Sequence, residues 1–162
     1  MNKCLISKKP IKPFMTFGKQ PIANGFLNKE FFENEYFFEM EVAFCETSKM
    51  FQLINIPDRE LMFNDSYAFF SGTSKYMANH FQNFANELLT NFIADKNDPF
   101  IVEIGSNDGI MLQNFSNKGI RHLGIEPSAN VAKVAKEKGI NTLVEFFDLS
   151  VAEKIVAKNG QA

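Results

Sequence analysis

One segment constrains this chain more than any other: a short, largely apolar run that ends in a turn bounded by two glycines. The run is Phe100–Ile104, and the turn that follows reads Gly105-Ser-Asn-Asp-Gly109. A run of this length and polarity is typical of a strand buried in a parallel sheet. A helix is expected directly after the turn, over residues 110–117, so the segment predicts a strand–turn–helix unit.

The same alternation of strand and helix continues after this unit. Ser128 is a plausible N-cap for the next helix, and Gly139 is a plausible residue to end it. Connections this short predict a parallel sheet built from right-handed crossovers. The expected fold class is therefore α/β, with a partial Rossmann-like sheet. The expected elements are a strand at 121–125, a helix at 129–138, a strand at 141–145 and a helix at 150–158.

The first part of the chain has a different pattern. Frequent prolines and glycines up to Pro57 exclude a long helix there, and residues 36–44 alternate in part between apolar and acidic, as a half-buried strand does. A helix is expected over residues 74–94, followed by a polar break that ends at Pro99. The apolar face expected on this helix consists of Met77, Phe81, Phe84, Leu88 and Phe92.

These patterns predict three parts. They are a small β-rich domain at 1–73, a linking helix at 74–98 and the N-terminal half of a Rossmann-like domain at 99–162. The formal net charge of −2 gives no basic footprint for nucleic acid. No apolar run approaches the roughly 20 residues that cross a bilayer, and no signal peptide is recognisable. We therefore expect a cytoplasmic protein, without nucleic-acid or membrane partners, whose two cysteines stay reduced.

The glycine-bounded turn is the candidate binding site. It follows the first strand of the parallel sheet, at the edge where open α/β sheets bind their ligands. Gly105 lets a ligand approach the backbone, and the start of the next helix offers free N–H groups to an anion such as a carboxylate. Glu126 ends the second strand, at the position from which a carboxylate accepts hydrogen bonds from ribose hydroxyls.

The residue between the glycines bears on which ligand is bound. A dinucleotide fingerprint requires a second glycine where this chain has Asn107, because a pyrophosphate must fit there. Asn107 leaves room for a smaller adenosyl ligand, and Glu103 would place a carboxylate near a sulfonium cation. This favours S-adenosylmethionine, while dinucleotide binding and an empty structural turn remain alternatives. The candidate cofactor contacts are Glu103, Gly105, Ser106, Asn107, Asp108, Gly109, Glu126 and Pro127.

Several longer motifs occur together and in a fixed order, at residues 21–24, 45–53, 67–74 with His80, 102–112, 122–132, 139–142 and 146–147. With them, the chain resembles the sugar C-methyltransferases that carry an N-terminal zinc-binding domain and act on nucleotide-linked 4-keto-deoxysugars. The resemblance implies a class I methyltransferase fold, with S-adenosylmethionine as cofactor and a nucleotide-sugar as substrate.

The resemblance also implies a reaction and two catalytic candidates. A base would remove the proton alpha to the sugar ketone, and the resulting enolate carbon would take the methyl group. Tyr67 matches a tyrosine of the family that lies near the sugar, so it is a candidate acid/base or substrate contact. His80 matches the family's histidine on the following helix. The alternative for both residues is a purely structural role, and His122 has no expected role.

The chain departs from the family at the zinc ligands. In the family two C-x-x-C pairs hold one zinc ion, whereas here the pairs are Cys4 with Ser7 and Cys45 with Ser48. A serine hydroxyl is a poor substitute for a thiolate in a structural zinc site. We therefore expect no zinc, with Cys4 and Cys45 as buried free thiols at degenerate ligand positions.

A second departure concerns length. The sequence stops where the fourth strand of a class I sheet should begin, so we expect a truncated or split chain with little or no methyl transfer activity. Half a sheet leaves an unpaired edge, which favours association with a partner chain or a missing C-terminal half. Two alternatives to a methyltransferase stay open. They are a non-catalytic cofactor-binding or assembly module, and a fragment of a nucleotide-binding oxidoreductase.

Overall fold

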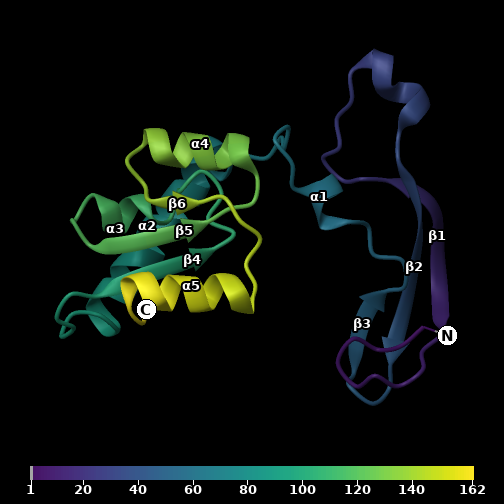
Figure 1. Cartoon of the computed structure of the whole chain (residues 1–162), viewed down its shortest axis with the longest axis horizontal. Helices are drawn as coiled ribbons and strands as arrows, with labels where there is room; N and C mark the ends of the chain where they lie inside the picture. The colour runs from purple at the N-terminus through teal and green to yellow at the C-terminus, as the bar shows by residue number, and fades with distance from the viewer. Residues whose placement is uncertain (1) are drawn as a thin grey trace. The chain divides into compact units, whose positions relative to one another are not determined.

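The computed structural model describes residues 2–162, which form two compact units, residues 2–62 and residues 63–162 (Figure 1). The first unit is β-rich and the second is built from alternating strands and helices. The chain therefore has an α/β fold with two separate sheets. None of the helices within residues 2–162 has the length and apolar character needed to cross a bilayer.

The first unit contains a three-stranded antiparallel sheet in the order β1-β2-β3. Its strands are β1 (Pro13–Pro21), β2 (Phe37–Cys45) and β3 (Met50–Leu53), with a 3-10 helix at Lys29–Asn34 and the short helix α1 at Arg59–Met62. The predicted strand at 36–44 is confirmed as β2.

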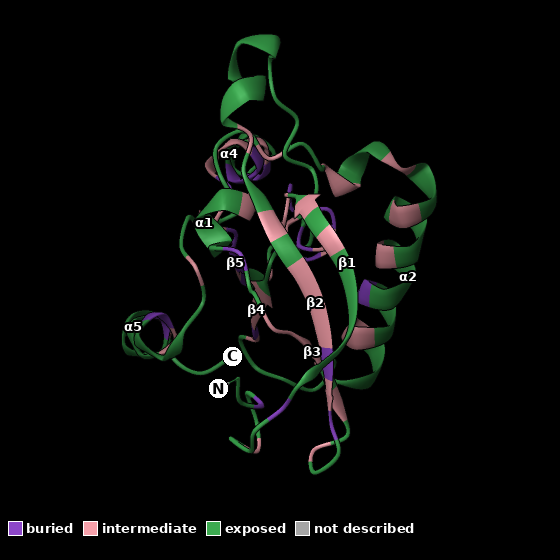
Figure 2. Cartoon of the chain, turned by 90° about the vertical axis from the view of Figure 1, so that its right-hand side faces the viewer, coloured by how far each residue is buried: buried purple, intermediate pink, exposed green. Residues whose placement is uncertain are grey.

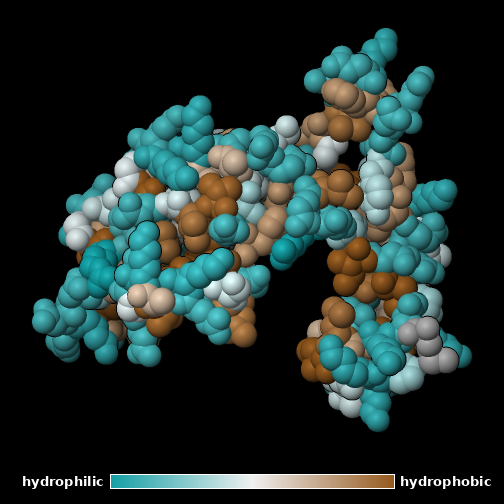
Figure 3. All heavy atoms as spheres, in the orientation of Figure 1, coloured by the Kyte–Doolittle hydropathy of each residue, from teal (hydrophilic) through white to brown (hydrophobic). Residues whose placement is uncertain are grey.

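The core of the first unit is small. Its buried residues are Cys4, Ile11, Ala43 and Cys45, and Ile54 packs against them. Most residues of β1 are exposed (Figure 2), and apolar side chains reach the surface of this unit (Figure 3). Because so little apolar area is buried, the contacts around the two cysteines carry much of the packing of this unit.

The second unit contains a three-stranded parallel sheet in the order β4-β5-β6. The elements of this unit are, in chain order, α2 (Lys75–Asn91), β4 (Phe100–Ile104), α3 (Gln113–Ser116), β5 (Arg121–Ile125), α4 (Ala129–Glu137), β6 (Thr142–Leu143) and α5 (Leu149–Asn159).

Apolar clusters lie on both faces of this sheet. Successive residues of a strand point to opposite faces, and Phe100 and Val102 join one cluster while Ile101 joins the other. The first cluster includes Val151 of α5, and the second includes Ala85 of α2. The sheet is therefore covered by helices on both sides, as a parallel sheet requires.

Some predicted elements are shorter than expected. The helix expected over 110–117 is reduced to α3, because the N–H groups of Asn114 and Phe115 bond to carbonyls three residues back, in tight turns. The strand expected at 141–145 pairs with β5 only at Thr142 and Leu143. The strand predicted at 121–125 is confirmed as β5, with those bounds.

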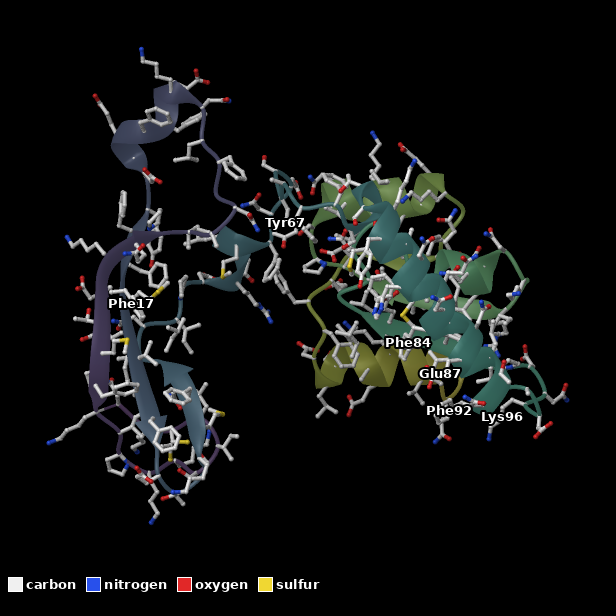
Figure 4. All side chains as sticks on the ribbon, turned by 180° about the vertical axis from the view of Figure 1, so that it is seen from behind. Phe17, Tyr67, Phe84, Glu87, Phe92 and Lys96 are labelled. Atoms are coloured by element: carbon white, nitrogen blue, oxygen red, sulfur yellow. The ribbon has the colours of Figure 1, made fainter. Side chains whose placement is uncertain are left out.

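The apolar face expected on α2 is only partly buried. Leu88 packs on the core, but Phe84 is 41% exposed and Phe92, just after the helix, is 64% exposed (Figure 4). The buried face instead runs through Ala85 and Leu89, one position along from the phenylalanines. The apolar spacing therefore placed the buried face about one position away from where it lies, since the helix packs closely through its small residue.

Candidate cofactor-binding site

The glycine turn lies where β4 ends, and it is fixed to the neighbouring strand. The N–H groups of Gly105 and Ser106 both donate to the carbonyl of Ile125, at 2.8 and 3.2 Å. Gly105 has φ +71°, and a Cβ at this position would meet no atom within 4 Å. The backbone at Gly105 therefore faces open space that a bound molecule could occupy.

Glu126 lies directly beside this turn, although it is distant in sequence. Its Oε2 accepts a hydrogen bond from the N–H of Asn107 at 3.0 Å, and its Oε1 accepts one from the N–H of Ser128 at 2.8 Å. The side chain is only 4% exposed. Glu126 thus holds the turn and the start of α4 together, and each oxygen keeps a lone pair for a further donor.

Ser128 takes the N-cap position of α4, but its hydroxyl does not cap the helix. The Oγ of Ser128 is buried without a hydrogen-bond partner among the described residues. The carboxylate of Glu126, two residues earlier, receives the Ser128 N–H instead. Pro127 between them is half-buried.

The side chain of Asn107 points to the segment around Phe69–Ser71. Its Oδ1 accepts from the N–H of Ser71 at 2.8 Å, and its Nδ2 donates to the carbonyl of Phe69 at 3.1 Å. Asn107 has φ +49°, in a region that asparagine tolerates better than most residues. Asn107 therefore connects the turn to the segment that carries Tyr67.

Asp108 makes a second connection to the same segment. Both of its carboxylate oxygens accept from the N–H of Gly72, at 3.0 and 3.2 Å. Lys138 of the α4 C-terminus donates to Asp108 Oδ2 at 3.1 Å and to its carbonyl at 3.0 Å. Sequence reasoning missed Gly72 and Lys138, since no local pattern reports a contact 30 or more residues away.

Asp108→Asn should lower the free energy of unfolding by about 2 kcal/mol, because Lys138 and the Gly72 N–H lose a buried charged acceptor. Urea unfolding of the full chain measures the change. Glu137→Gln is the matched control, since its ion pair with Lys133 is exposed and 3.9 Å long. Equal stability of the two variants would contradict this role for Asp108.

Glu103 is the most perturbed carboxyl of the second unit. It lies on β4 just before the turn, and its Oε2 is buried with no hydrogen-bond partner in residues 2–162. Burial raises the pKa of Glu103 from 4.5 to about 7. A half-buried carboxyl with one buried oxygen left without a partner, just before an open turn, is well suited to meet a cation or a donor of a bound molecule.

The raised pKa of Glu103 makes stability depend on pH. Between pH 4.5 and 7 the folded state holds a proton that the unfolded state has lost, so stability should fall as pH rises, by roughly 2 to 3 kcal/mol. Glu103→Gln should remove this part of the slope in urea titrations across that range. Glu153→Gln, an exposed carboxyl on α5, should leave it in place. An unchanged slope in Glu103→Gln would contradict the assignment.

The remaining turn residues are packed inward. Ser106 is 1% exposed, and its Oγ has no hydrogen-bond partner in the described part of the chain. A Cβ on Gly124 of β5 would collide with that Oγ, so a glycine there lets the turn lie close to the strand. Gly109 has φ +77° and lies against Ile140 and Ala135. Sequence reasoning placed Ser106 and Gly109 at the site but missed Gly124.

Tyr67 is held near the start of α4. Its carbonyl accepts from Asn130 Nδ2 at 2.8 Å, and its ring packs on Phe63 with centroids 5.4 Å apart (Figure 4). His80 is exposed on α2, and its ring contacts Phe81. Among the contacts found within residues 2–162, none brings His80 to the glycine turn. The catalytic role of either residue stays a prediction.

His122 has a structural position. It is buried on β5, its Nδ1 donates to the carbonyl of Ile120 at 2.8 Å, and its Nε2 accepts from the N–H of Asn141 at 3.2 Å. The two bonds fix the tautomer with the proton on Nδ1. His122 therefore joins β5 to the start of β6.

The four positions of the degenerate zinc pairs meet in the first unit. Cys4 shares a hydrogen bond with Ser48, and Cys45 shares one with Ser7, each at 3.2 Å. The hydrogen bonds from Ser48 and then Ser7 lower the pKa of Cys4 to about 6 and also lower the pKa of Cys45, while burial acts in the opposite direction.

The donor set of this cluster does not fit a structural zinc ion. Such a site takes four strong ligands, and here two positions are neutral hydroxyls. Within residues 2–162 no group of three or more His, Cys, Asp or Glu side chains could hold a metal ion.

Two comparisons with known proteins bear on the family to which this chain is similar. Residues 4–63 match a family model described as "Putative zinc binding domain". Together with the relative described next, this match confirms the predicted resemblance to the N-terminal region of sugar C-methyltransferases. The family model covers the first part of the chain alone.

The relative is the C-methyltransferase NovU of Streptomyces niveus. The two sequences are 27% identical over 149 residues, which cover 91% of this chain and 35% of NovU. The chain therefore spans about a third of the length of the curated relative it matches.

Proposed function

We propose that this chain is the N-terminal region of an S-adenosylmethionine-dependent C-methyltransferase that acts on a nucleotide-linked keto-deoxysugar. The observation that carries the proposal is the pairing of an open Gly105 backbone with the buried carboxylate of Glu126, 3.0 Å from the N–H of Asn107. The parallel sheet order β4-β5-β6 agrees with the first three strands of a Rossmann-like sheet.

The residues around the turn fit S-adenosylmethionine. Space at Gly105 would take the ligand against the backbone, and Glu126 would accept from its ribose hydroxyls. Glu103 would place its carboxyl, whose Oε2 has no partner among the described residues, near the cationic end of the ligand. When bound, S-adenosylmethionine supplies a methyl group activated by its sulfonium.

A dinucleotide fits the same turn less well. The side chain of Asn107 fills the position where a pyrophosphate needs glycine, and its two hydrogen bonds to Phe69 and Ser71 hold it there. We therefore rank a nucleotide-binding oxidoreductase fragment below a methyltransferase.

The proposed reaction is removal of a proton alpha to the sugar ketone, followed by methylation of that carbon. Tyr67 is the first candidate for an acid/base or substrate contact, because the hydrogen bond from Asn130 fixes its backbone beside the start of α4. His80 is the second candidate, since it lies on the helix that follows the Tyr67 segment. Both roles come from the family resemblance.

A non-catalytic cofactor-binding or assembly module is the second candidate function. It is favoured by an unpaired edge of the sheet in the second unit. Among the described residues β4 pairs only with β5, and Ile104 at the end of β4 is 59% exposed. An unpaired edge of this kind is suited to accept a further strand.

Labelled S-adenosylmethionine distinguishes these functions. The full chain should retain the label in equilibrium dialysis, while methyl transfer to a nucleotide-linked 4-keto-deoxysugar stays near background. Retention of labelled NAD in place of S-adenosylmethionine would favour the oxidoreductase alternative. If neither ligand is retained, the proposed function is wrong and only the assembly module is left.

A further inference from the structure

The first unit contains two turns of the same local form. One runs from Cys4 to Ser7 and the other from Cys45 to Ser48. Each is followed by a lysine in the left-handed region, with φ 58° at Lys8 and 55° at Lys49. Non-glycine residues rarely adopt this conformation, so its occurrence at both equivalent positions shows that the two turns share one backbone geometry.

The side chains of the two turns pair crosswise. The Sγ of Cys4 lies 3.2 Å from the Oγ of Ser48, and the Oγ of Ser7 lies 3.2 Å from the Sγ of Cys45. Each contact joins residues about 40 positions apart. Both sulfur atoms belong to nearly inaccessible residues, with Cys4 0% and Cys45 2% exposed.

We propose that these two thiol–hydroxyl hydrogen bonds hold the turns together in place of a metal ion, so that the first unit folds without zinc. The chemistry of the four donors supports this. A serine hydroxyl keeps its proton and is a weak metal ligand, whereas a structural zinc ion requires deprotonated thiolates or imidazoles. The hydrogen bonds also give partners to the sulfur atoms of the two buried cysteines.

The same geometry predicts that a zinc site can be created. In a tetrahedral site with Zn–S bonds of about 2.3 Å, neighbouring sulfur atoms lie roughly 3.7 Å apart. The two observed S···O distances are 3.2 Å, so four sulfur atoms need only a small expansion of the cluster. Replacing Ser7 and Ser48 with cysteine should therefore yield four converging thiols.

The first experiment compares the natural chain with Ser7→Cys/Ser48→Cys, both produced with added zinc. The natural chain should hold no stoichiometric zinc, and EDTA should not shift its thermal midpoint. The double variant should hold about one zinc per chain, and EDTA should lower its midpoint by at least about 5 °C, because bound metal is folding free energy. The amide signal of Ala43, in the core of the first unit, reports unfolding of this unit by NMR.

Stoichiometric zinc in the natural chain, with a midpoint that falls on chelation, would overturn the proposal. A folded double variant that takes up no zinc would contradict the claim that the two turns bring their four side chains together in the geometry of a zinc site. Ser7→Ala/Ser48→Ala tests the hydrogen bonds themselves and should lower the midpoint by about 5 °C. Thr47→Ala, a change at an exposed residue of the second turn, is the control. Equal thermal midpoints for Thr47→Ala and the double alanine variant would also overturn the proposal.

Discussion

Gly109→Ala should lower the free energy of unfolding of the second unit by about 3 to 4 kcal/mol. Backbone strain and a steric collision both contribute to this loss. Gly109 has φ +77°, where any side chain strains the backbone, and its Cβ would collide with Cδ1 of Ile140 and lie 3.3 Å from Cβ of Ala135. Ile140 is 2% exposed, so it has little room to move.

Gly139→Ala separates the backbone strain from the steric collision. Gly139 has φ +79°, but a Cβ there would meet no atom within 4 Å, so this variant should lose only about 1 kcal/mol. Adding Ile140→Val to Gly109→Ala removes the colliding Cδ1 and should recover about 1 kcal/mol. Urea unfolding measures all the variants, and equal losses at Gly109 and Gly139 would contradict the packing argument.

Gly105→Asn should weaken binding of S-adenosylhomocysteine at least about 30-fold, equivalent to about 2 kcal/mol. A side chain at position 105 would enter the open space beside the turn, where we propose that the ligand binds. Asparagine is chosen because it adopts positive φ at lower cost than other residues. Titration calorimetry on the full chain measures the affinity.

Gly119→Asn is the matched control for this experiment. Gly119 has φ +68° and also no atom within 4 Å of its would-be Cβ, but it lies between α3 and β5, at the opposite end of the strands. The two variants should unfold at similar urea concentrations while only Gly105→Asn loses affinity. Equal affinity for both would show that the ligand does not bind against Gly105.

Local patterns predicted much of the second unit. The apolar run at Phe100–Ile104 and the strand before Glu126 were found as expected, because buried parallel strands and the turns after them are set by nearby residues. Ser74 caps α2 with its side chain, at 3.3 Å from the N–H of Met77, as a serine before a helix often does. Element ends were less predictable, since α3 and β6 depend on contacts with other parts of the fold.

The contacts that define the candidate site are mostly long-range and could be predicted only in part. The approach of Glu126 to the turn follows from the rule that parallel strands end at one edge. The links from Asn107 and Asp108 to residues 69–72 do not, because no spacing in the sequence reports them. These two residues were expected to contact a cofactor, and the structure shows that their side chains already have protein partners.

The most direct test of the account is a titration of the isotope-labelled full chain with S-adenosylhomocysteine, followed by NMR of the backbone amides. We expect the signals of Gly105, Asn107 and Ser128 to shift and saturate together, since these amides form or adjoin the contact between the turn and Glu126. NAD should leave them unchanged. If S-adenosylhomocysteine leaves these signals in place, or if only NAD shifts them, the turn is not the binding site of an adenosyl methyl donor.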